Sequence, residues 1–211
     1  NVPKMIEVLS RIFGEYPFEK YGMAVVYPFN YGGEEHQTIS TIHRDWLYYG
    51  EEIGILHELS HQWWGDLVTC KTWKDIWLNE SFATYSEYLW LEKINSNKDA
   101  LLSKLFSYET FNKDWEKAIY DPEGQGIELF SDIVYKKGAL VLHTLRNIIG
   151  DSIFFNCLKE YREKFEYSYA ETKDFIEIVN KCTNKDYQWF FDLYIYSKGY
   201  PKVKFYYIYN K

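Results

Sequence analysis

The sequence predicts an α+β fold dominated by helix, in which a small strand region is followed by a helical body. Strand-like segments near the start are confined to residues 21–27 and 38–42, whereas most of the remaining chain carries apolar residues at helical spacing. The sequence contains no internal repeats. With 211 residues, 46% of them apolar, the chain can bury a sizeable core.

The first fifty residues supply the expected strands. Residues 2–13 have the apolar spacing of a helix, which the glycine and proline that follow bring to an end. Residues 21–27 (YGMAVVY) are typical of a buried strand, and residues 30–33 (NYGG) of a turn. Residues 38–42 (TISTI) alternate in polarity, which predicts a second strand with one solvent-exposed face.

Helices are expected to follow one another after the strands. Residues 95–99 (NSNKD) and 121–126 (DPEGQG) are typical of loops, and Gly150 ends a helix. The last residues, 203–209, predict a strand after the turn at 199–201 (GYP). The helices are expected over residues 51–67, 77–94, 101–119, 132–149, 153–165 and 172–182.

The charge of the chain excludes some classes of partner. Its 24 basic and 31 acidic residues give a net charge of −7, which argues against a nucleic-acid partner and against binding to an anionic membrane. No apolar run is long enough to span a bilayer. Because the chain opens at Asn1 within a predicted helix, we expect it to be a piece of a longer protein, and its compartment is unknown.

The cysteines argue against a disulfide framework and a cysteine-based zinc site. Cys70, Cys157 and Cys182 are odd in number and far apart, and no C-x-x-C motif occurs. One surface disulfide pair remains an open alternative.

The segment LHELSH, residues 56–61, contains the metal-binding motif H-E-x-x-H. Four helical residues rotate by ~400°, so His57 and His61 lie ~40° apart on one helix face, as two zinc ligands require. Glu58 lies beside them, close enough to a metal-bound water without being a ligand. Glu80 follows His61 by 19 residues and opens the next predicted helix, which can return its carboxylate to the histidines. Two histidines, one glutamate and an open water position make a catalytic zinc site.

The alternative interpretation is a pair of surface histidines on a helix. In a chain of this length with five histidines, the motif arises by accident on the order of once in a hundred sequences. A glutamate at the expected later spacing lowers that chance by roughly another factor of ten. The motif therefore favours a metal site.

Six segments occur in this order along the chain: YPF with Lys20 (16–18), GGEEH (32–36), HELSHQWWG (57–65), WLNESFA (77–83), VYKKG (134–138) and GYP (199–201). Together they resemble the zinc aminopeptidases that include aminopeptidase N and the leukotriene hydrolases, which are gluzincins with a thermolysin-like catalytic domain. The resemblance covers nearly the whole chain. In two places this sequence departs from the pattern G-x-M-E-N, since Glu34 replaces Met and His36 replaces Asn, whereas Glu35 is kept.

The resemblance implies one Zn²⁺ per chain and a role for each catalytic residue. Glu58 is expected to be the general base that takes a proton from the zinc-bound water and passes it to the leaving amine. Tyr135 is expected to donate a hydrogen bond to the developing oxyanion. The implied reaction is hydrolysis of the amino-terminal peptide bond.

The resemblance also implies how the substrate is held. Glu35 is expected to pair with the free α-amine, which makes the enzyme an exopeptidase. Gly32 and Gly33 would let the substrate backbone approach closely, and the strand at 38–42 could pair with that backbone. His36 is expected to line the cavity because it follows Glu35.

The resemblance fixes the expected domain organisation. Residues 1–211 are expected to form a single zinc-peptidase catalytic domain, with a strand-containing lead-in over 1–50 that carries the exopeptidase motif. The helical zinc-binding part is expected over 51–200. Further amino- and carboxy-terminal domains of a parent protein are implied as partners, together with peptide substrates that have a free amino terminus.

Several other side chains have expected roles outside the reaction. Thr84 and Glu87 follow Glu80 on one helix face, where either could orient a zinc-ligating histidine. His143 is expected to pack in the core and His43 to lie in a solvated turn. Four tryptophans in or between the two motif segments are expected to pack the motif helices together: Trp63, Trp64, Trp73 and Trp77.

Two other functions stay open. The same zinc chemistry would serve an endopeptidase or an epoxide-opening hydrolase, although Glu35 favours exopeptidase action. A non-catalytic interaction domain could also keep this fold. Stoichiometric zinc would argue against such a scaffold, and all five expected ligands and catalytic groups are present.

Overall fold

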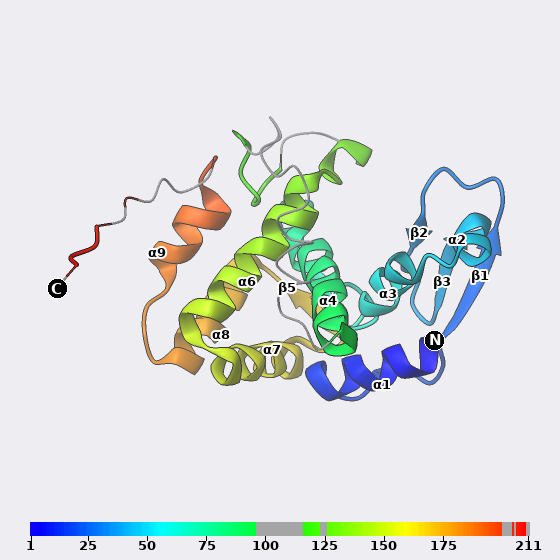
Figure 1. The fold of residues 1–211 in the computed structure, drawn as a ribbon, viewed down its shortest axis with the longest axis horizontal. Coiled ribbons are helices and arrows are strands. Elements are labelled where there is room, and N and C mark those ends of the chain that lie inside the picture. Colours follow the sequence, from blue (N-terminus) through cyan, green and yellow to red (C-terminus); the bar gives the residue numbers. More distant parts are fainter. Residues whose placement is uncertain (96–115, 123–125, 200–203, 205, 210–211) are drawn as a thin grey trace.

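The computed structural model has a small sheet at one end and a group of helices at the other (Figure 1). It describes residues 1–95, 116–122, 126–199, 204 and 206–209. Most of the helix expected over 101–119 lies outside the described residues, as do parts of the expected loop at 121–126 and the turn at 199–201. The helix-dominant α+β class is confirmed.

The first fifty residues form helix α1 (Val2–Phe13) and, after it in the sequence, a three-stranded sheet. Strand β1 (Gly22–Val26) runs parallel to β3 (Ile39–His43), and β2 (Gly33–Glu34) runs antiparallel to β3 on its other side. The strand expected over 38–42 is therefore the central strand of the sheet. Since both of its edges are already paired, the expectation that it could pair with a substrate is wrong, and β2 is the edge strand nearest the site.

A short helix, α2 (Arg44–Tyr49), follows β3 directly. His43 is its N-cap, and the His43 ring accepts a hydrogen bond from the Asp45 backbone N–H at 3.1 Å. The solvated turn expected at His43 is thus wrong, because this residue ends a strand and caps a helix.

The motif helix is shorter than the spacing predicts. Helix α3 (Glu52–Ser60) ends where His61 takes the C-cap position, yet the His61 N–H still bonds to the His57 carbonyl oxygen at 3.3 Å. The chain then turns through Gly65, whose φ of 144° suits glycine, into β4 (Val68–Cys70). Strand β4 pairs in parallel with β5 (Ser168–Ala170), a remote partner that local periodicity cannot predict.

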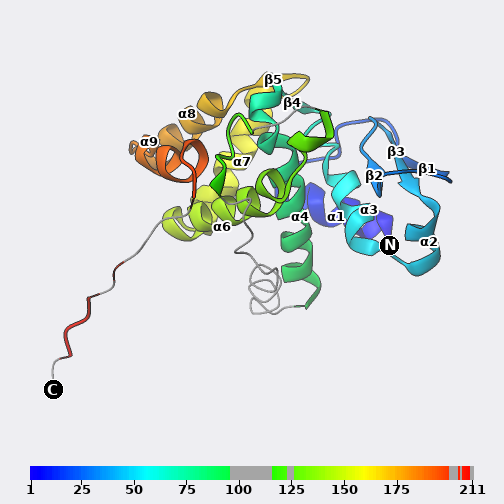
Figure 2. The ribbon, with the colours of Figure 1, turned by 90° about the horizontal axis from the view of Figure 1, so that it is seen from above.

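The second motif helix, α4 (Trp77–Asn95), lies at the centre of the molecule (Figures 1 and 2). It follows the 3-10 turn η1 (Trp73–Asp75) and packs against α1, α3 and α6. From Trp77 to Tyr88 every side chain except Glu87 is buried, so this part of the helix has no solvent-facing stripe. Most of its polar side chains must therefore find partners inside the protein.

The helical body completes the core on the other side of α4. Phe82, Tyr161 and Phe175 pack together with ring centroids 5.2 to 5.9 Å apart. The expected strand over 203–209 is wrong, because the described residues 204 and 206–209 form no regular structure. The elements are η3 (Gly126–Leu129), the π-helix η4 (Ile133–Lys137), α6 (Gly138–Ile149), α7 (Asp151–Phe165), α8 (Thr172–Thr183), α9 (Gln188–Phe191) and the π-helix η5 (Asp192–Tyr196).

The cysteines and the helix lengths agree with what the sequence predicts about disulfides and membrane spans. All three cysteines are free thiols in the structure. In the part of the chain that the structure describes, every helix is too short or too polar to cross a membrane.

Candidate metal centre and active site

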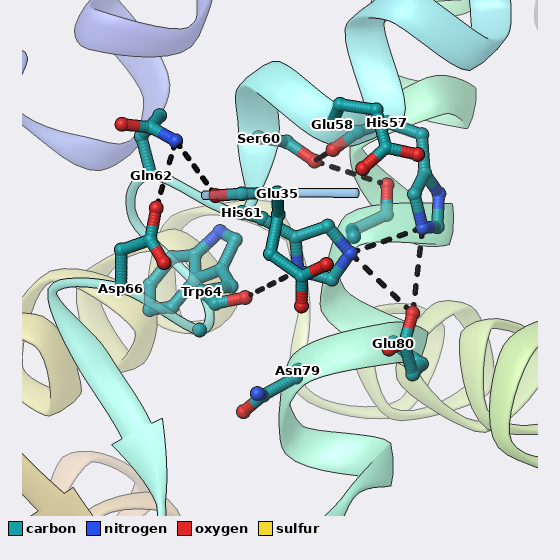
Figure 3. Close-up of polar contacts among 12 residues, drawn as sticks. Glu35, His57, Glu58, Ser60, His61, Gln62, Trp64, Asp66, Asn79 and Glu80 are labelled. Carbon is teal, nitrogen blue, oxygen red and sulfur yellow. Dashed lines mark hydrogen bonds and ion pairs between the residues drawn. The ribbon is translucent and has the colours of Figure 1, made fainter. Parts of the chain in front are cut away.

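Three side chains converge where α3 meets α4 (Figure 3). The Nε2 atoms of His57 and His61 lie 3.1 Å apart, and each lies 3.4 Å from Oε2 of Glu80. Glu80 stands in the first turn of α4. The side chains of His57, His61 and Glu80 are 12%, 1% and 4% exposed, so little of the cluster's own surface is in contact with solvent.

This triangle of atoms fits a zinc ion. Tetrahedral bonds of about 2.0–2.1 Å place neighbouring zinc ligands about 3.3–3.4 Å apart, close to the distances observed here. Imidazole nitrogen and carboxylate oxygen are also ligands that zinc prefers. The residues present therefore fit the expected group, with one tetrahedral position left for water or substrate.

The two imidazole rings are held so that their Nε2 lone pairs face the centre. Nδ1 of His57 lies 2.8 Å from Oε1 of Glu87, and Nδ1 of His61 lies 2.9 Å from the Trp64 carbonyl oxygen. Because a carboxylate and a carbonyl can only accept, each Nδ1 must donate its proton. The neutral rings then carry their lone pairs on Nε2.

Of the two residues expected to orient a histidine, the structure brings only Glu87 to the site. Thr84 is buried on α4, and its hydroxyl has no hydrogen-bond partner among the described residues.

Charges inside the cluster shift the pKa of every ligand. Burial raises the pKa of Glu80, but the two histidines outweigh that effect and bring it down to about 2. Burial alone would lower the pKa of both histidines, but the nearby carboxylates have the larger effect and raise it. Glu80 and Glu87 raise the pKa of His57 well above its usual value, and Glu35 and Glu80 raise that of His61 to about 9. Zinc must therefore compete with protons for both rings.

Zinc affinity is accordingly expected to rise with pH. Because the neighbouring carboxylates raise the pKa of both histidines, that of His61 to about 9, zinc must displace a proton to bind, and its affinity should increase more than about 10-fold between about pH 6 and about pH 8. Competition against a chromophoric chelator, corrected for the chelator's own protons, measures this. An affinity that stays constant over this range would contradict the raised pKa of the two histidines.

Glu58 lies beside the metal ligands and faces β2. Its side chain is buried, and this burial is the main reason that its pKa is raised to about 7. Glu35 and Glu80 also raise the pKa, whereas the two histidines partly lower it. A Cβ atom at Gly33 would lie 2.3 Å from Oε1 of Glu58. Gly33 is therefore required where the sheet edge meets this carboxylate.

Replacing Gly33 by alanine is expected to displace the Glu58 carboxylate. Misplacing a catalytic group by about 1 Å can cost about 100-fold in rate, so kcat/KM should fall by about 10- to 100-fold with zinc retained. Gly22→Ala is the matched control, because no atom lies within 4 Å of a Cβ built there. Steady-state kinetics and metal analysis of both variants test this, and equal activities would refute the contact with Glu58.

Gly32 has a similar close neighbour. A Cβ at Gly32 would lie 2.1 Å from the ring of Trp46, and one at Gly54 would lie 2.7 Å from the same ring. The structure thus gives both glycines of the GGEEH segment a role in packing, whereas the approach of a substrate backbone remains a prediction.

Tyr135 reaches the centre from the π-helix η4. Its ring centroid lies 5.8 Å from that of His57. Ser81 on α4 donates a hydrogen bond to the Val134 carbonyl oxygen, and a Cβ at Gly138 would lie only 1.8 Å from the Ser81 hydroxyl. This close approach fixes the wider π turn that presents Tyr135. Burial, Glu80 and other carboxylates raise its pKa far above the usual value, so the phenol remains a proton donor.

A cleft of about 1000 Å³ opens over the ligands. Glu35 lies at one side of it, with Oε1 4.0 Å from Nδ1 of His61, and Glu34 also lines it. His36 does not, since its exposed ring instead lies 3.2 Å from the Thr41 hydroxyl. Trp73 is 63% exposed and lines the cleft, so the expectation that it packs the motif helices is wrong, whereas Trp63, Trp64 and Trp77 are buried as expected.

Two polar residues next to the ligands were not singled out from the sequence. Asn79 accepts a hydrogen bond from the Cys70 backbone N–H at 3.1 Å, which ties β4 to α4 one residue before Glu80. Gln62 contacts the segment that carries Glu35. Their position beside metal ligands is the only signal in the sequence, because their partners lie elsewhere in the chain.

Fold and site together define the class of protein, a zinc metallopeptidase domain of the thermolysin-like type. Residues 1–194 match the model of the peptidase family M1 domain, and the chain belongs to this family.

Relatives of known name and structure agree with this assignment. Aminopeptidase N of Lactococcus lactis is 34% identical over 71% of this chain, and aminopeptidase N of Haemonchus contortus is 31% identical over 87%. The M1 zinc metallopeptidase of Deinococcus radiodurans is 30% identical over 95% of this chain, with a TM-score of 0.82. Leukotriene A4 hydrolase of Saccharomyces cerevisiae is 25% identical over 97%, with a TM-score of 0.81.

The chain spans only part of each relative. It corresponds to 19% and 21% of the two aminopeptidases N, and to 44% and 36% of the two solved chains. Most of each relative's length therefore lies outside the part that this chain matches.

Proposed function

We propose that this domain hydrolyses the amino-terminal peptide bond of peptides in a zinc-dependent reaction. The observation that carries the proposal is the position of Glu35, whose carboxylate lies within 4.8 Å of both Glu58 and His61. A carboxylate held beside a metal ligand and a candidate general base suits a free α-ammonium group. In support, a variant of the Deinococcus radiodurans relative has been solved with a Tyr-Ser-Ala substrate bound.

The proposed metal count is one zinc per chain, held by His57, His61 and Glu80. A second acidic group, formed by Glu35, Glu58 and His61, shares His61 with the first. The single free lone pair of that ring already faces His57 and Glu80. The second group therefore offers only two carboxylates, too few for a structural or catalytic zinc.

The chain's own residues divide the chemistry between them. Zinc, when bound, supplies a Lewis acid that polarises the scissile carbonyl and makes water more acidic. Glu58 takes a proton from the attacking water and delivers it to the leaving nitrogen. Tyr135 donates its hydroxyl proton in a hydrogen bond to the carbonyl oxygen as negative charge develops there.

Glu35 sets which bond is cut. Its carboxylate pairs with the α-ammonium group, so the first residue is held between Glu35 and the ligands. The carbonyl of that residue then faces the metal, and the bond cleaved is the first one. An acetylated amine has no charge to pair with Glu35, and the carboxylate is left unpaired.

The test compares aminoacyl amides that have a free amine with the same amides acetylated, in the natural full-length protein. We expect cleavage of the free-amine set only, abolished by a chelator and restored by zinc. Glu35→Gln should weaken cleavage of the free-amine set. Equal cleavage of both sets would contradict exopeptidase action and favour an endopeptidase.

A further inference from the structure

The side chain of Gln62 connects the metal-binding turn to the loop that carries Glu35 (Figure 3). Gln62 directly follows the ligand His61 and is completely buried. Its Oε1 accepts from the backbone N–H of Thr38 at 2.8 Å and from the hydroxyl of Tyr16 at 3.1 Å. Its Nε2 lies within hydrogen-bond distance of three acceptors: the carbonyl oxygens of Glu35 at 3.3 Å and His36 at 3.5 Å, and Oδ2 of Asp66 at 2.7 Å.

These contacts hold a stretch of backbone that the sheet does not hold. The ladder between β2 and β3 pairs Gly33 with Ile42 and Glu34 with Thr41, and it ends there. Glu35 is the next residue, so its carbonyl is bound by Gln62 instead of by a neighbouring strand. The orientation of the Glu35 side chain depends on this backbone.

The loop also contains a strained residue. Thr38 has a φ of 67°, a left-handed conformation that is rare for a β-branched residue. Such a conformation persists only where surrounding contacts impose it. The hydrogen bond from the Thr38 N–H to Gln62 is one of these contacts. The Gln62 side chain thus contacts the backbone on both sides of the turn, at Glu35 and His36 before it and at Thr38 after it.

We propose that Gln62 is a positioning residue that fixes the Glu35 carboxylate at the correct place to receive the substrate's α-ammonium group. This inference rests on the proposed function, in which Glu35 binds that group. The buried amide makes both kinds of contact because it has a donor and an acceptor at one end. Methionine has neither at this position, and glutamate has only acceptors.

The test uses two zinc-binding inhibitors that differ only in the amine. Leucine hydroxamate has the α-amine, and isocaprohydroxamate lacks it. The ratio of their inhibition constants measures amine recognition separately from metal binding. In Gln62→Met and Gln62→Glu we expect the preference for leucine hydroxamate to fall by about 10- to 100-fold. This factor corresponds to the free energy of a hydrogen bond to a charged group, here the bond between the Glu35 carboxylate and the α-ammonium group. The constant for isocaprohydroxamate should change less than about 3-fold, with one zinc per chain retained.

Tyr16→Phe is the matched control. It removes one hydrogen bond to Gln62 but leaves the contacts with residues 35–38 in place. We expect this variant to keep the wild-type ratio. Glu35→Gln should lower the ratio as strongly as the Gln62 variants do.

The outcomes separate this inference from the function on which it rests. If Glu35→Gln lowers the ratio and both Gln62 variants keep it, the role of Gln62 is refuted and the proposed function stands. If Gln62→Glu weakens both inhibitors equally or loses zinc, Gln62 supports the metal site alone and the inference is again refuted. If the wild-type protein does not distinguish the two inhibitors, both proposals fail.

Discussion

Glu58→Gln is expected to lower kcat by about 10²- to 10⁴-fold while the protein keeps one zinc per chain. The amide has nearly the shape of the carboxylate but cannot take a proton from water. The Glu58 carboxylate lies outside the triangle formed by the Nε2 atoms of His57 and His61 and Oε2 of Glu80. Its replacement should therefore leave all three metal ligands in place.

Parallel measurements of turnover and bound zinc test this expectation. Glu51→Gln provides the matched control, because Glu51 is exposed at the start of the same helix and its side chain caps nothing. The control should retain wild-type turnover. Loss of zinc in Glu58→Gln, or turnover close to wild type, would contradict the assignment of Glu58 as the general base.

Tyr135→Phe is expected to lower kcat by about 10²- to 10³-fold with little change in KM. The hydroxyl would stabilise charge that exists only in the transition state, so its loss should not weaken ground-state binding. Because the pKa of this phenol is raised far above its usual value, it should remain a donor across the working pH range. Steady-state kinetics on a free-amine substrate measure the two parameters separately.

The matched control for this prediction is Tyr31→Phe. Tyr31 lines the same cleft but is 49% exposed on the segment before β2. Its hydroxyl should be dispensable for kcat. If Tyr135→Phe raised KM and left kcat unchanged, Tyr135 would be a substrate contact and not the stabiliser of the oxyanion.

The metal ligands could be predicted because their relation is local. His57, Glu58 and His61 lie within one helical turn of each other, so their spacing alone places two imidazoles on one face. Glu80 needed only the assumption that the next helix returns to the first. The fold class could be predicted for a similar reason, since the first helix and the strands that follow it show clear helical or alternating spacing of apolar residues.

The contacts that tune the site could not be predicted in the same way. Strand β4 pairs with β5, about a hundred residues later in the chain, so no local pattern predicts it. The motif helix was predicted too long because residues 61–67 remain apolar at helical spacing, although α3 ends at Ser60. Gly33 faces Glu58, and Gln62 faces the loop at 35–38, across a distance in sequence that no local pattern spans. Strand β2 is only two residues long, so the sequence does not predict it, and without it β3 seemed to have an edge free for a substrate.

The most direct test of a zinc aminopeptidase is to identify which bond is cut. A short synthetic peptide, with its amino end either free or acetylated, would be incubated with the natural full-length protein and the products followed by mass spectrometry. We expect the free peptide to lose single residues one after another from its amino end, and the acetylated peptide to stay intact. Cleavage at internal bonds, or equal cleavage of both peptides, would contradict it.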